Sequence, residues 1–146
     1  MRGGDRFRQR LAELAAQAAD GRGLKVRVGI FENAKYEDGT PVAAVAFWNE
    51  YGTAHIPPRP FFRNTVAAHK GEWPRQAAAV MQANGGDVRQ TLALMGEGVK
   101  GQIVETVQDF REPRNAPSTV RKKGFDKPLI DSGTLWRSIG SGIAEE

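Results

Sequence analysis

The chain has 146 residues, of which 40% are hydrophobic and 26% are charged. This size and composition predict one globular domain, residues 1–146, whose core needs no metal or disulfide. The sequence contains no cysteine, which excludes disulfides, thiolate zinc sites and thiol catalysis. No apolar run approaches the roughly 20 residues of a membrane helix, so we expect a protein made in cytoplasm that does not contact a membrane.

The net charge of +4 is concentrated in one loop, residues 111–128. This segment has six basic and two acidic side chains, six minus two or +4, whereas the rest of the chain has fifteen of each. Three interpretations stay open: contact with DNA phosphates, contact with an acidic protein surface, and a solvated loop. Phe125 is the only ring in the segment, which leaves no platform for base stacking. The candidate contact residues are Arg114, Arg121, Lys122, Lys123 and Lys127.

The first two predicted elements are a helix over residues 5–20 and a strand over residues 24–30. The helix has apolar side chains at the i, i+4, i+7, i+8, i+11 spacing of one face, with Asp5 as a cap and Gly21 as the stop. This stripe consists of Phe7, Leu11, Leu14, Ala15 and Ala18. The strand alternates apolar with polar or small residues, the pattern of a half-buried strand.

The next elements depend on prolines. A short helix is expected over residues 41–51, with Thr40 as its cap and Pro41 at its first position. Residues 53–59 should be extended, because a residue that precedes proline is driven out of the helical region. Pro60 can then begin a third helix.

Beyond that helix, glycine and proline near residues 71–74 interrupt the helical pattern, which then continues to residue 85. Asp87 and Gln90 resemble a capping box, and the apolar stripe that follows predicts the longest helix, residues 88–111. Within the basic segment we expect one short turn capped at residues 118–119, and after the segment a short helix at residues 131–137.

A weak final strand over residues 138–144 completes the predicted elements. Asp131 is the expected cap of the short helix before it. The predicted fold class is therefore α+β, a mainly helical domain with a small antiparallel sheet built around the strand at residues 24–30.

The spacing of Gly96, Gly98 and Gly101 matches the dinucleotide fingerprint G-x-G-x-x-G. That fingerprint works only where a strand meets the start of a helix, and here the preceding residues have a helical pattern. Glycine costs roughly 1 kcal/mol relative to alanine inside a helix. Three glycines therefore indicate a close crossing by another backbone more than a nucleotide site.

Residues that could support catalysis are few and scattered. The two histidines, His55 and His69, have no carboxylate at metal-ligand spacing, so we interpret His55 as a loop residue and His69 as the exposed end of a helix. Nothing in the sequence brings Glu50 or Asp131 near the acidic pair at residues 37–38. We expect no enzyme activity, no cofactor and no metal.

The segment of residues 49–63 combines prolines and glycine with large apolar side chains, which suits a surface held in one shape. Phe61 and Phe62 are adjacent, and adjacent helical residues point about 100° apart, so one face cannot easily bury both. One of them, or a tryptophan, is expected to fill a pocket in a neighbouring subunit. The candidate subunit-interface residues are Trp48, Pro57, Pro58, Arg59, Phe61, Phe62 and Trp136.

These segments, in this order, resemble tailed-phage neck and tail-completion proteins, similar to the lambda minor tail protein Z group and related head-tail joining proteins. The most specific part is the run Ile56-Pro57-Pro58-Arg59-Pro60-Phe61-Phe62-Arg63. The other matching runs are residues 45–53, 93–96, 117–119, 123–124 and 127–139. Ser132 departs from the pattern, in which threonine is expected at that position.

The resemblance implies a non-enzymatic virion protein that is assembled in the host cytoplasm. It implies a homo-oligomer, with a hexameric ring expected, at the head-proximal end of the tail or at the head-tail junction, where DNA passes through the lumen. Its partners would be tail-tube, tail-terminator or head-connector proteins. The competing hypothesis is a small nucleic-acid-binding module that uses residues 111–128.

Overall fold

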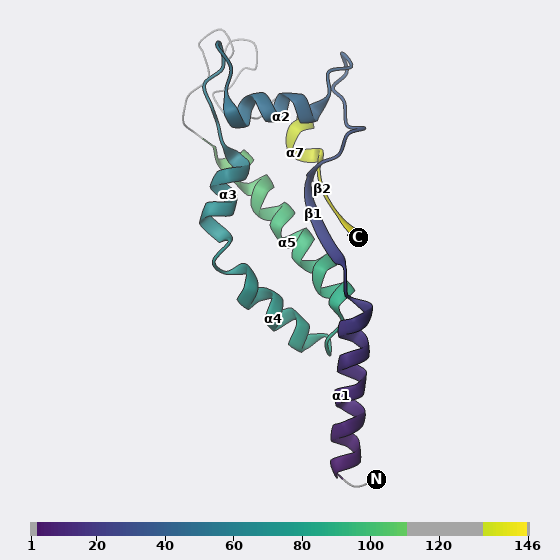
Figure 1. Ribbon diagram of the computed structural model, residues 1–146. Helices are drawn as coiled ribbons and strands as arrows, with labels where there is room; N and C mark the ends of the chain where they lie inside the picture. Colours follow the sequence, from purple (N-terminus) through teal and green to yellow (C-terminus); the bar gives the residue numbers. More distant parts are fainter. Residues whose placement is uncertain (1–2, 111–132, 146) are drawn as a thin grey trace.

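The computed structural model describes residues 3–110 and 133–145, and Figure 1 shows their arrangement. The chain has the α+β fold predicted from the sequence, with helices around a two-stranded antiparallel sheet. Its elements are α1 (Gly3–Asp20), β1 (Leu24–Ile30), α2 (Val42–Tyr51), α3 (Phe61–His69), α4 (Trp73–Ala83), α5 (Val88–Asp109), α7 (Thr134–Arg137) and β2 (Ile139–Glu145).

Helix α5 is the axis of the fold, and the sheet lies against it (Figure 1). Strands β1 and β2 pair over seven residues, from Leu24 opposite Glu145 to Ile30 opposite Ile139. The expected final strand is therefore confirmed. As predicted, α5 is the longest helix among the described residues, and the Asp87 side chain caps it by accepting a hydrogen bond of 3.0 Å from the backbone N–H of Gln90.

The close crossing predicted from three glycines occurs at only one of them. A Cβ atom on Gly96 would lie 2.6 Å from Val26 Cγ2 and 3.1 Å from Ser141 Cβ, so Gly96 lets α5 approach both strands. A Cβ on Gly98 or Gly101 would meet nothing within 4 Å. The three residues lie inside α5, away from its N-terminus, so they do not form the strand-to-helix turn of a dinucleotide site.

The hydrophobic core lies at the end of α5 where α2, α3 and α7 meet it. The buried side chains are Val42, Ala46, Phe61, Ile103, Val107, Phe110, Leu135 and Ile139. Beside this core, the buried Thr65 hydroxyl donates to the Phe61 carbonyl and bonds the Thr106 hydroxyl, both at 2.7 Å, and so links α3 to α5.

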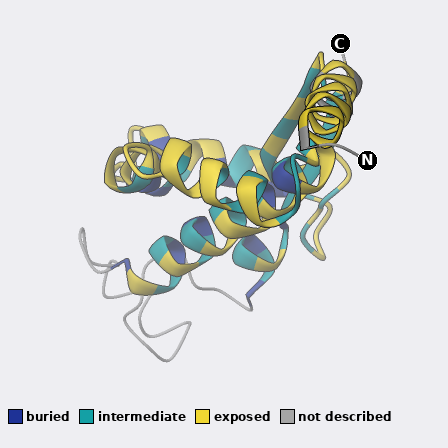
Figure 2. Cartoon of the chain, turned by 90° about the horizontal axis from the view of Figure 1, so that it is seen from below, coloured by how far each residue is buried: buried dark blue, intermediate teal, exposed yellow. Residues whose placement is uncertain are grey.

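Helix α1 leaves this body and extends away from it, with its residues largely exposed (Figures 1 and 2). Arg10 Nη2 donates to the Gly85 carbonyl at 3.0 Å, which ties α1 to the turn between α4 and α5. A Cβ atom on Gly21 would lie 2.4 Å from Val88, so the chain needs glycine where α1 ends against α5.

Three predicted helix starts are corrected. Helix α1 begins at Gly3, so Asp5 lies in its first turn and is not its cap. Pro41, with an extended backbone, is the N-cap residue of α2, and Thr40 is not its cap. Thr40 instead belongs to the preceding turn, where its carbonyl accepts from the Tyr36 N–H and its N–H donates to the Asp38 carboxylate. Helix α7 begins after Gly133, a glycine at φ 77°, while the expected cap Asp131 and the turn at residues 118–119 lie outside the described residues.

Among the described helices, none combines the length and the apolar character needed to cross a membrane.

Candidate interaction surface on helices α2 and α3

Glu50, at the end of α2, caps the start of α3. Its carboxylate accepts hydrogen bonds from the backbone N–H groups of Phe62 at 3.0 Å and Arg63 at 2.9 Å. The N-cap residue of α3 is Pro60, whose side chain has no oxygen to accept these bonds. Glu50 is only 4% exposed, so the first turn of α3 solvates its charge in place of water.

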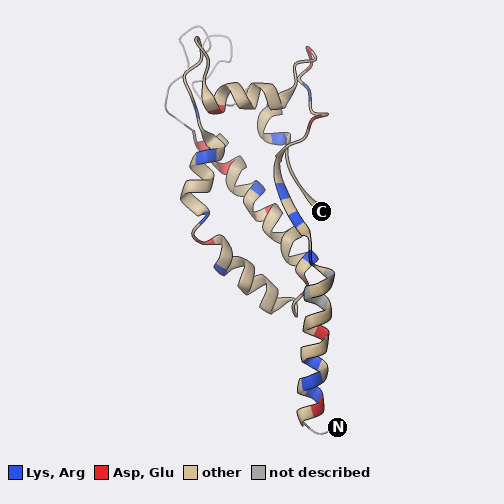
Figure 3. Cartoon of the chain, viewed as in Figure 1, with Lys and Arg blue, Asp and Glu red and all other residues tan. Residues whose placement is uncertain are grey.

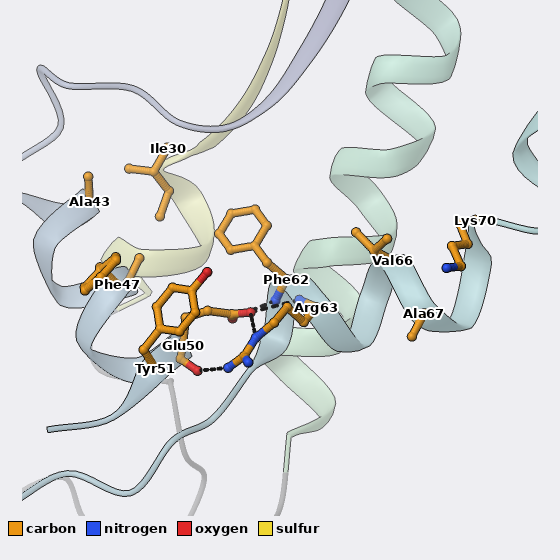
Figure 4. Close-up of a pocket in the computed structure, with 11 residues that line it drawn as sticks. Ile30, Ala43, Phe47, Glu50, Tyr51, Phe62, Arg63, Val66, Ala67 and Lys70 are labelled. Atoms are coloured by element: carbon orange, nitrogen blue, oxygen red, sulfur yellow. Dashed lines mark hydrogen bonds and ion pairs between the residues drawn. The ribbon is translucent and has the colours of Figure 1, made fainter.

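Arg63 completes this junction from the solvent side. Its Nε donates to the Glu50 carboxylate at 3.1 Å, and its guanidinium lies 4.6 Å from the centre of the Tyr51 ring. Figure 4 shows the Glu50 carboxylate between Tyr51 and Arg63, with dashed lines to the α3 backbone. One carboxylate therefore joins two helices and positions a cation over an aromatic ring.

The loop between the two helices is held by contacts among its own residues. Gly52 has φ 77°, and a Cβ there would lie 3.0 Å from the Ile56 carbonyl and from Pro58. The Thr53 hydroxyl accepts from the N–H of His55 at 3.2 Å and of Ile56 at 3.0 Å. His55 is therefore an exposed loop residue bonded locally, as expected. The expected extended segment is corrected, because the chain bends at residues 54–56, where the Thr53 N–H donates to the Ile56 carbonyl at 2.8 Å.

This geometry corrects part of the expected interface. Phe61 is fully buried in the chain's own core and Arg59 is 7% exposed, so neither side chain is available to a neighbouring subunit. Phe62 is half-buried, with its ring 4.7 Å from that of Phe61, so both rings do pack within one chain. The buried face of α3 accommodates Phe61 and the adjacent groove accommodates Phe62, so the two rings do not need one shared helical face.

The other expected interface residues lie nearer the surface. Trp48, Pro57 and Pro58 are exposed, whereas Trp136 is half-buried against the core with the Arg137 guanidinium 5.2 Å from its ring. Trp48 and Trp136 do not line the groove beside Phe62.

An open apolar groove of about 530 Å³ runs between α2 and α3 (Figure 4). Most side chains that line the groove are aliphatic or aromatic. Two of these aromatic side chains are largely exposed, Phe47 at 61% and Tyr51 at 56%. Helix α2 carries no lysine or arginine (Figure 3), so the cations at the rim come from α3 and the residue that follows it, Arg63 and Lys70. The lining residues are Ile30, Ala43, Ala46, Phe47, Glu50, Tyr51, Phe62, Arg63, Val66, Ala67 and Lys70.

Sequence reasoning missed the groove residues Phe47, Tyr51 and Val66. One signal was available: α2 is apolar around most of its circumference, more than one buried face requires. The capping role of Glu50 had no local signal, because its partners lie twelve and thirteen residues further along the chain.

The remaining candidate residues stay apart. His69 is half-buried at the end of α3, not exposed as expected, and lines a cavity of about 330 Å³ with Glu105 and Asp109. Within residues 3–110 and 133–145, no three His, Cys, Asp or Glu side chains are grouped so that they could hold a metal ion. The basic candidates Arg114, Arg121, Lys122, Lys123 and Lys127 lie outside the described residues.

The carboxyl group of Asp38 has a lowered pKa. The backbone N–H of Thr40 donates to its carboxylate at 2.9 Å and lowers the pKa of that carboxyl. The group is exposed in a surface turn, which indicates a structural role for the charge.

Comparisons of the chain with protein-family models, with curated proteins and with solved structures found no match. The functional assignment therefore depends on the residues themselves and on the surface described above.

Proposed function

We propose that this chain is a structural virion protein of a tailed phage or prophage, which completes the tail or joins it to the head. The observation that carries the proposal is the segment of residues 49–63, whose sequence resembles these proteins. In the fold, this segment connects α2 to α3 rigidly, because Glu50 caps α3 and Gly52 and Thr53 hold the loop. Such a rigid connection suits a structural protein that must keep its shape.

The proposed working form is a ring of identical subunits at the head-proximal end of the tail. A ring needs a heterologous interface, in which two different surfaces of each subunit meet. Exposed aromatic side chains beside a groove are typical anchors of such interfaces. The α2–α3 groove, with Phe47 and Tyr51 at its edge, supplies one of the two surfaces.

A gene deletion tests the biological role. A phage or induced prophage that lacks this chain should accumulate filled heads and separate tails, visible by negative-stain electron microscopy, and its infectivity should return when the chain is supplied from a plasmid. Mass spectrometry of purified particles should detect the chain in the virion. Normal infectivity without the chain, or its absence from purified virions, would contradict the proposal.

A further inference from the structure

Two uncovered apolar surfaces lie at opposite ends of the molecule. Among the described residues, most exposed large apolar side chains lie on α1 or line the α2–α3 groove, and the others are Phe31, Trp48 and Leu94. Figure 1 places α1 at one end of the body and α2 at the other. A single subunit therefore cannot cover one surface with the other.

The α1 surface is a stripe made by Phe7, Leu11 and Leu14. Phe7 is 65% exposed and Leu11 is 49% exposed, so the helix face that would normally pack on a core remains open. The spacing i, i+4, i+7 is the one with which an amphipathic helix anchors in an apolar groove. At 1.5 Å per residue, the helix of 18 residues is about 27 Å long, enough to reach across to an adjacent subunit.

We propose that α1 of one copy docks in the α2–α3 groove of the next copy, so that identical subunits connect head to tail. The inference deepens the proposed ring by naming its two contacting surfaces, and it therefore rests on that proposal. Phe7 and Leu11 would lie against Phe47, Tyr51 and Val66. Because helix and groove are different surfaces, each copy uses both, and the chain of contacts can close into a ring.

The charges around the two surfaces predict how this contact responds to salt. On a helix of 3.6 residues per turn, Arg8 and Arg10 flank the stripe, while Arg63 and Lys70 stand at the groove rim. Arg10 is already bonded to Gly85 and Glu13, and Arg63 to Glu50. These bonds offset the charges of Arg10 and Arg63 with Glu13 and Glu50. The like charges that remain are those of Arg8 and Lys70, and added salt should strengthen the apolar contact by screening their repulsion. Association driven by an acidic partner would weaken instead.

A complementation experiment with the full chain tests the pairing. The helix variant carries Phe7→Gln and Leu11→Gln, and the groove variant carries Phe47→Arg and Val66→Arg, all at exposed positions. Each variant alone should associate about 100-fold or more weakly than the wild-type chain, because anchor residues carry most of the binding energy. Mixed together, they should form one-to-one dimers and nothing larger, because only one intact helix and one intact groove remain.

Native mass spectrometry with one variant isotopically labelled distinguishes the mixed dimer from either homodimer. The matched control is Leu94→Gln, an exposed leucine on α5 outside both surfaces, which should associate like the wild type. Circular dichroism verifies that each variant keeps its helices. Wild-type chains that stay monomeric, or either variant alone that still associates with itself as the wild type does, would each overturn the inference.

Disulfide trapping gives an independent test, because the chain has no cysteine of its own. A mixture of Leu11→Cys and Phe47→Cys chains should form a disulfide-linked heterodimer, since that bond needs Cα atoms within about 7 Å. A mixture of Leu94→Cys and Phe47→Cys chains should not. If Leu11→Cys chains link only to each other, α1 pairs with α1 and the inference is wrong. That outcome would leave the virion role itself intact, because the gene deletion tests it separately.

Discussion

Glu50 and Arg63 are joined through both side chain and backbone, because the Glu50 carboxylate accepts from the Arg63 backbone N–H at 2.9 Å and from its Nε at 3.1 Å. The backbone bond caps α3, while the side-chain bond is an ion pair whose arginine is 55% exposed. A buried cap contributes more to stability than a solvent-screened ion pair. The two parts of the contact can be separated by substitution.

Glu50→Ala should lower the free energy of unfolding by about 1–3 kcal/mol, because it leaves two N–H groups of α3 without their acceptor. Arg63→Ala keeps the cap and should cost at most about 1 kcal/mol. Urea denaturation followed by circular dichroism measures both values. Glu105→Ala, at an exposed position of α5, is the control with little expected effect. A larger loss for Arg63→Ala than for Glu50→Ala would refute the capping role.

The same substitution at two glycines of α5 should have opposite effects. Gly98→Ala should raise the free energy of unfolding by about 0.5–1 kcal/mol, because alanine favours the helix and its Cβ meets nothing within 4 Å. Gly96→Ala should lower it, because its Cβ would overlap Val26 at 2.6 Å. Thermal and urea unfolding of both variants measure the difference. Equal effects would mean that α5 does not cross the sheet at Gly96.

Thr65 and Thr106 should act as a coupled pair. Thr65→Val keeps the side-chain volume but removes the bond between the two hydroxyls, with an expected loss of about 0.5–1.5 kcal/mol. Thr106→Val alone should also destabilise, and the double variant should lose less than the sum of the two. A double-mutant cycle of urea unfolding measures this coupling. Strict additivity would show that the hydroxyls do not interact.

Asp38 should titrate below its ordinary pKa of 3.8, because the Thr40 N–H stabilises the charged carboxylate in the turn. A carboxyl whose pKa is lower in the folded state stabilises the fold above its unfolded pKa, and loses that contribution as pH falls through the folded pKa. NMR titration of the Asp38 carboxyl carbon measures the value. Thr40→Pro, which removes the N–H donor, should return it toward the ordinary range. A pKa at or above 3.8 in the wild type would contradict the predicted shift.

The hypothesis that the basic segment, residues 111–128, binds DNA comes from the sequence alone and can be tested separately. If residues 111–128 contact DNA, binding of the chain to duplex DNA should weaken steeply between low and physiological salt. Replacing Arg121, Lys122 and Lys123 together with glutamine should reduce the slope of log affinity against log salt by about 2–3. Fluorescence anisotropy measures the slope, with a triple replacement of Arg6, Arg8 and Arg10 as the control of equal charge. No binding at low salt would remove the DNA hypothesis.

The sequence by itself determined the local elements of this protein, because periodicity, caps and prolines act over a few residues. The helix that carries Phe7, Leu11 and Leu14 and the Asp87 cap of α5 were predictable in this way. The proposed virion role also depends on the sequence, on the run of residues 56–63.

Only the tertiary structure decided which surfaces stay uncovered. The bonds from Glu50 to α3, the burial of Phe61 and Arg59, and the crossing at Gly96 join residues that no local pattern relates. A helical stripe in a sequence looks the same whether it packs on its own core or stays open. Burial depends on the position of every other element, so the open face of α1 and the α2–α3 groove become apparent only once the chain has folded.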